Sequence, residues 1–181
     1  IGIALEPFML TLVTADSRSD RAVKGLVQLS ESEERGRQLF FREYDPKGKT
    51  KGAECFHCHA APFFTNDKFM NNGLNDDASV KDIGREGVTK LATDRAKFKV
   101  PTLRNIARSA PYMHDGRFTT LEEVVHFYNS NVQKSATVDP LMQFLIRPGI
   151  GLSANDEADL VAFLKTLNDD NFLTNARFRM P

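Results

Sequence analysis

Two cysteines and the histidine that follows them are the residues of this chain whose types and spacing suggest chemistry. Cys55 and Cys58 lie three positions apart and are its only cysteines, and His59 comes directly after the second. Two thiols at this spacing can each form a thioether with a haem vinyl group, while the next imidazole binds the iron. We therefore predict one covalent haem c, attached through Cys55 and Cys58, with His59 as the proximal ligand.

Two other uses of this motif fit the rest of the chain less well. A thioredoxin-like dithiol needs a βαβ setting, and the sequence has no strand pattern of that kind. A structural zinc site needs four ligands in a tetrahedron, but Cys55, His57, Cys58 and His59 crowd one turn, and there is no second cysteine pair. We predict that His57 faces the solvent or a haem propionate and does not bind iron.

Composition and charge limit the classes of partner. The chain has 181 residues, of which 41% are hydrophobic, and this is enough for one domain with its own core. Basic and acidic residues both number 24, so the zero net charge gives no reason to expect a nucleic acid or a membrane surface. No apolar run approaches the ~20 residues that cross a bilayer.

The chain begins with an apolar stretch that we interpret as a helix and not as an export signal. Residues 1–13 contain Glu6 and Pro7, lack a basic start and are not followed by a clear cleavage site. Because the first residue is not Met, we expect a processed or truncated product. Covalent haem without a free cysteine is typical of oxidising compartments, so we predict a periplasmic or extracellular location.

Apolar residues at helical spacing predict an all-α fold with long irregular loops. The helices before and after the motif resemble the cytochrome c arrangement, which implies a helical domain wrapped around one covalent haem. Ser30 and Glu33 fit a capping box that starts a helix burying Leu39 and Phe40. Gly36 in this helix would let another helix approach closely. The other expected helices cover residues 2–13, 119 or 120 to 128, and 153–167, whereas residues 60–99 form a long irregular region.

Several blocks along the chain resemble the C-terminal haem domain of the bacterial di-haem cytochrome c peroxidases and their MauG-like branch. The most specific block is Pro111-Tyr-Met-His-Asp-Gly116. The others are residues 16–39, 98–106, 121–128 and 159–167. The resemblance implies that residues 1–28 connect to a separate or missing haem domain and that residues 29–181 form the haem domain. It also implies a peroxidase-type oxidoreductase, in which this domain relays electrons to a second, peroxide-reacting haem.

The resemblance further implies roles for residues near the haem. The sixth iron ligand falls fourteen positions after His114, at Tyr128, where the peroxidases have Met and MauG-like proteins have Tyr; Met113 is the runner-up. His114 should lie near the haem without binding the iron. His126 should be a surface residue and Met142 a core residue.

Four more residues receive roles from the same resemblance. We expect Arg104 to pair with a haem propionate and Tyr112 to contact the cofactor. The backbone carbonyls of Ser109 and Pro111 would face a calcium ion held between two domains. The chain has no tryptophan, which argues against a charge-hopping route through an indole.

Two other functions remain open at this stage. The single haem motif also fits a free-standing monohaem cytochrome c that carries electrons, or a structural subunit of a redox complex. For the di-haem interpretation, the expected partners are a second haem domain or chain and a redox protein, such as a small cytochrome or a copper protein.

Overall fold

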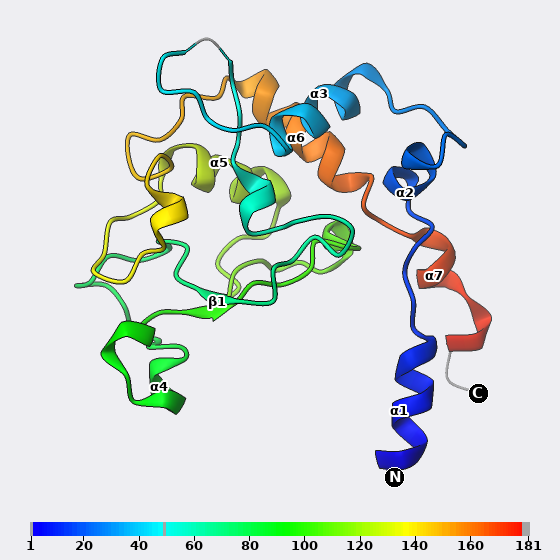
Figure 1. The fold of residues 1–181 in the computed structure, drawn as a ribbon, viewed down its shortest axis with the longest axis horizontal. Coiled ribbons are helices and arrows are strands. Elements are labelled where there is room, and N and C mark those ends of the chain that lie inside the picture. Colours follow the sequence, from blue (N-terminus) through cyan, green and yellow to red (C-terminus); the bar gives the residue numbers. More distant parts are fainter. Residues whose placement is uncertain (1, 49, 179–181) are drawn as a thin grey trace.

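The computed structural model describes residues 2–48 and 50–178, and it is mostly helical and loop-rich (Figure 1). The helices are α1 (Gly2–Thr11), α2 (Arg18–Val23), α3 (Glu31–Phe40), α4 (Glu86–Thr89), α5 (Leu121–Ser130), α6 (Ala154–Lys165) and α7 (Asp170–Thr174). Short 3-10 turns cover Cys55–His57, Ala92–Asp94, Ile106–Arg108, Pro140–Met142 and Ala176–Phe178. In the described part of the chain, no helix is both long and apolar enough to cross a membrane.

A small sheet is the departure from the all-α prediction. Strands β1 (Phe69–Met70) and β2 (Phe98–Lys99) pair antiparallel, with Phe69 opposite Lys99. The strands have two residues each, too few for an alternating pattern to be read from sequence. They join the two ends of the long region that the sequence predicts to be irregular.

Capping boxes start the predicted helices where the sequence places them. The side chains of Ser30, Thr120 and Ser153 each accept a hydrogen bond from the backbone N–H three residues later, at the start of α3, α5 and α6. In each box the acidic side chain at that third position accepts a hydrogen bond from the cap backbone N–H in return, which satisfies two otherwise unpaired donors. A fourth box, Ser17 with Asp20, starts α2, a helix that the sequence analysis did not identify.

The packing of α3 on α6 forms the centre of the core (Figure 1). A Cβ atom added to Gly36 would lie 1.9 Å from the backbone oxygen of Asp159, so the two helices touch through their backbones there. Beside this contact, the rings of Phe40 and Phe163 pack with their centroids 5.2 Å apart. Both side chains are fully buried, and the burial of Phe40 agrees with the prediction for α3. The predicted close approach at Gly36 is therefore confirmed.

The segment before α3 is tied to the body of the chain by two acidic side chains. The carboxylate of Asp169 accepts hydrogen bonds from the backbone N–H groups of Ala15 and Asp16. Asp20 forms a two-bond ion pair with Arg104, at 2.8 and 2.9 Å. By contrast, α1 extends away from the rest of the chain (Figure 1). The division into a connector, residues 1–28, and a haem domain, residues 29–181, stays a prediction.

We expect Gly36→Ala to destabilise the haem-loaded protein by about 3 kcal/mol, because the new methyl group forces α3 away from α6. Gly87→Ala is the matched control, since its added Cβ would lie 3.7 Å from Ile83 in ordinary contact. This control should change stability by less than about 1 kcal/mol. Urea unfolding measures both, and equal stability of the two variants would contradict the close contact.

The Asp20–Arg104 pair should make stability depend on acid pH. Burial raises the pKa of Asp20, but hydrogen bonds from Arg104 and Ser17 outweigh this effect and lower the pKa to about 2. A carboxyl with a lowered folded-state pKa stabilises the protein above its usual pKa, and this stability is lost as the pH falls toward the folded value. Asp20→Asn should therefore destabilise the protein more at about pH 5 than at about pH 2.5. The urea midpoints of wild type and variant test this, and an equal gap at both pH values would refute it.

Candidate haem-binding site

The cysteine motif forms a tight turn, so its three functional side chains come from one short segment. Glu54, with a left-handed φ of 59°, precedes the 3-10 turn Cys55–His57. The backbone N–H of His59 donates to the carbonyl of Cys55 at 3.0 Å, which continues the turn to the histidine. Cys55, Cys58 and His59 are all partly buried. The turn therefore holds two thiols and one imidazole together at the edge of the core.

Both thiols are neutral and free of disulfide bonds. Burial raises the pKa of Cys55 to about 12, and the neighbouring charge of Cys58 adds to the effect. Burial likewise raises the pKa of Cys58 to about 11. A low pKa is what makes a thiol a redox or catalytic group, so these cysteines do not have the character of an active dithiol. They fit the thioether attachment that the motif predicts.

The imidazole of His59 is oriented for metal binding by the main chain. Its Nδ1 lies 3.0 Å from the carbonyl oxygen of Phe64. Because a carbonyl only accepts, Nδ1 carries the proton and Nε2 keeps its lone pair. Burial lowers the pKa of His59, which also favours the neutral ring. Metal-binding histidines commonly have this arrangement, with one nitrogen donating to a carbonyl and the other binding the metal.

The side-chain amide of Asn72 contacts both candidate sixth ligands. Nδ2 of Asn72 donates to the hydroxyl of Tyr128 at 3.0 Å and lies 3.5 Å from the sulfur of Met113. Burial raises the pKa of Tyr128 to about 12, and the hydrogen bond from Asn72 opposes this effect only in part. Sequence reasoning did not identify Asn72. Its signal was the Asn71-Asn-Gly73 turn, in which Asn71 and Asn72 are both at least partly buried.

The remaining residues expected near the cofactor have other contacts in the described structure. The ring of His114 stacks on Phe98, with centroids 3.7 Å apart and the planes 9° from parallel. Besides Asp20, the guanidinium of Arg104 donates to the carbonyl of Pro62. The hydroxyl of Tyr112 donates to the carbonyl of Ile106 at 3.1 Å. The roles of these three residues toward a haem stay predictions.

The two residues expected at the calcium ion follow the short turn Ile106–Arg108. Ser109 and Pro111 are exposed, and the Ser109 hydroxyl donates to the Ile106 carbonyl. Their calcium role also stays a prediction. The expectations for two other residues are confirmed, since Met142 is buried and His126 is exposed on α5.

A surface cleft of about 380 Å³ lies beside the candidate sixth ligands. Asn72, His114 and Arg117 are among its lining residues. Asn72 therefore lines the cleft and also contacts Tyr128, the first candidate for the sixth ligand. The donor set as a whole fits a c-type haem. It has two neutral thiols for attachment, one oriented imidazole, and a partly buried phenol and thioether that contact the same amide.

Known proteins with similar sequences include MauG and cytochrome c peroxidases. No protein-family model matches the chain. It is 34% identical to the methylamine utilization protein MauG of Methylophilus methylotrophus, over 91% of this chain and 45% of that protein. It is 32% identical to the cytochrome c551 peroxidase of Nitrosomonas europaea, over 94% of this chain and 44% of that protein. The chain thus spans about half the length of these relatives.

Solved structures give the same family and fold. A MauG-like protein associated with microbial copper homeostasis superposes with a TM-score of 0.78 at 36% identity, covering 93% of this chain and 52% of that one. The diheme peroxidase BthA of Burkholderia thailandensis has the same fold, with a TM-score of 0.67 at 23% identity, covering 89% and 48%. By sequence and fold together, this chain belongs to the family of MauG and the bacterial di-haem cytochrome c peroxidases.

Proposed function

We propose that this chain is a c-type haem domain that relays electrons to a second, peroxide-reacting haem in a peroxidase-type oxidoreductase. One observation carries the proposal: the motif histidine donates from Nδ1 to a main-chain carbonyl and keeps Nε2 available for iron, while one amide, Asn72, contacts both candidate sixth ligands. When bound, the haem supplies one-electron redox chemistry. The protein supplies attachment through Cys55 and Cys58, the proximal ligand His59, and a second ligand from Tyr128.

A protein side chain as the second iron ligand favours electron transfer over direct reaction with peroxide at this domain. A side chain in the sixth position leaves no coordination site for a small substrate. Asn72 donates to the Tyr128 oxygen, so it also stabilises a phenolate there. A tyrosine ligand holds ferric iron, whereas a methionine raises the potential. Met113, on the same amide, is the alternative ligand.

The second haem belongs to a part of the protein outside this chain or to another chain. The support is that the relatives are about twice as long as the matched region, while the chain has one haem motif. In this proposal a small cytochrome or copper protein supplies electrons, and His114 lies near the haem. Arg104 and Tyr112 contact the haem or its propionates. The Ser109 and Pro111 carbonyls face a calcium ion at the domain boundary, and the location is periplasmic or extracellular.

A free-standing monohaem electron carrier is the alternative function, and the single motif favours it. The intact mass of the purified protein and its turnover with peroxide distinguish the electron carrier from the electron relay. One haem in total and no turnover with peroxide would support the carrier. Two haems and turnover would support the relay.

We expect Tyr128→Phe to remove the sixth ligand and convert the oxidised haem to a high-spin spectrum. Tyr44→Phe is the matched control, because the ring of Tyr44 packs on Phe144 and is not a candidate ligand, and its spectrum should not change. Visible and near-infrared spectra of oxidised and reduced protein measure this. An unchanged spectrum with a methionine-to-iron charge-transfer band would make Met113 the ligand.

We also expect His59→Gln to abolish electron delivery from a reduced small cytochrome, lowering turnover with hydrogen peroxide by at least about 100-fold. His126→Gln removes a surface histidine and should leave turnover at the wild-type level. Stopped-flow reduction and steady-state turnover of the full-length protein test this. Normal turnover of the His59 variant would refute the relay role.

A further inference from the structure

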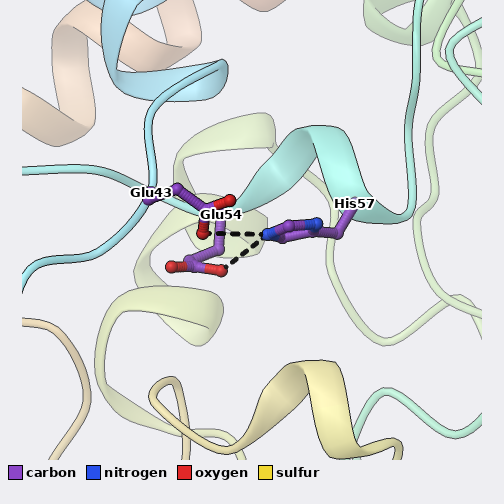
Figure 2. A group of neighbouring side chains, drawn as sticks. All are labelled: Glu43, Glu54 and His57. Carbon is purple, nitrogen blue, oxygen red and sulfur yellow. Dashed lines mark hydrogen bonds and ion pairs between the residues drawn. The ribbon is translucent and has the colours of Figure 1, made fainter.

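A second group of side chains with the chemistry of metal ligands includes His57, the histidine between the two cysteines of the motif. Figure 2 shows the carboxylates of Glu43 and Glu54 both directed at the ring of His57. Nε2 of His57 lies 3.1 Å from Oε2 of Glu43 and 3.0 Å from Oε2 of Glu54. The three ligand atoms all lie within 4.8 Å of one another. None of these residues is used by the proposed electron relay.

The backbone brings the two glutamates together without help from the haem. A Cβ atom added to Gly52 would lie 2.3 Å or less from the carbonyl oxygens of Arg42 and Glu43, so the segments on either side of this loop touch. The backbone N–H of Glu54 donates to the Arg42 carbonyl at 3.3 Å. This contact sets Glu43 beside Glu54 at the start of the turn that carries His57.

The group has more negative charge than its imidazole can neutralise. Two carboxylates face a single ring nitrogen, which carries at most one hydrogen. The side chain of Glu54 is only 6% exposed, and its other oxygen accepts the backbone N–H of Tyr44. Among the described residues, neither glutamate forms an ion pair with a lysine or arginine. A buried carboxylate in this position is stabilised by a further cation.

We propose that Glu43, Glu54 and His57 bind a divalent transition-metal ion, with Cu²⁺ bound most tightly. One imidazole and two carboxylates are suitable ligands for such ions, and Cu²⁺ has the highest affinity in the divalent series. Two ligands on one ion at about 2.1 Å are separated by about 3.0 to 3.4 Å. The two distances from Nε2 of His57 to the carboxylates are close to these values. Glu43 is 65% exposed, so the ion has access from solvent.

The bound ion would act on the neighbouring cofactor through its charge. His57 lies between the two cysteines that attach the haem, so the ion adds positive charge near the ring. Positive charge disfavours the oxidised state, and we expect the haem midpoint potential to rise when the metal binds. This consequence rests on the proposed haem function, whereas metal binding itself does not.

The site is tested by titrating the haem-loaded protein with CuCl₂ in a calorimeter and recording the copper EPR spectrum. We expect one tight equivalent with splitting from a single imidazole nitrogen. Glu43→Gln should weaken binding at least about tenfold, since even residues that only support a ligand contribute that much. His126→Gln is the matched control, because His126 pairs with one carboxylate only, Glu157 at 3.1 Å, and its loss should leave the tight site intact.

Several outcomes would overturn the proposal. They are the absence of a stoichiometric site, a Glu43→Gln variant with wild-type affinity, or a tight site lost in His126→Gln. Glu43 is an exposed residue, so its variant should fold normally, and an unchanged haem spectrum checks this. A redox titration with and without Cu²⁺ then tests the charge effect, and an unchanged midpoint potential in the copper-loaded protein would refute that part.

Discussion

The backbone contact between α3 and α6 at Gly36 is the constraint on which the rest of the structure depends. It places the carbonyl end of α3 over the core, where the oxygen of Leu39 accepts the backbone N–H of Ala53. That hydrogen bond lies two residues before Cys55. The position of the haem motif therefore follows from a helix crossing that only a residue without a side chain permits. A larger residue at position 36 would displace the cysteine turn as well as the core.

The candidate iron ligands are neutral polar groups, and hydrogen bonds hold His59 and Tyr128 in place. The Phe64 carbonyl sets the tautomer of His59, and Asn72 binds the hydroxyl of Tyr128. Burial keeps Tyr128 neutral, because the desolvation of a phenolate without a cation is costly. In the proposed haem-bound protein a ferric iron would supply that cation, so the same burial that disfavours the free phenolate would favour an iron-bound one.

Local features could be predicted from the sequence, and contacts between distant residues could not. A capping box depends on residues three positions apart. The boxes at Ser30, Thr120 and Ser153 lie at the starts of three helices that the sequence predicts. The pairing of Asn72 with Tyr128 joins residues 56 positions apart, and that of Arg104 with Asp20 joins residues 84 positions apart. No periodicity connects such residues. The ion pair of Arg104 with Asp20 could therefore not be predicted, and the role of Arg104 toward a propionate stays a prediction.

The two histidines of the cysteine turn have different hydrogen-bond partners, and these partners suit them to different metals. His59 has a neutral carbonyl as its partner, whereas Glu43 and Glu54 lie around His57. The two histidines are two residues apart, yet a main-chain carbonyl orients one and carboxylates surround the other. Imidazole alone does not select a metal; its partners do. In the two proposed sites, the carbonyl would leave His59 neutral toward a haem iron, whereas the carboxylates would supply the negative charge that a divalent ion needs.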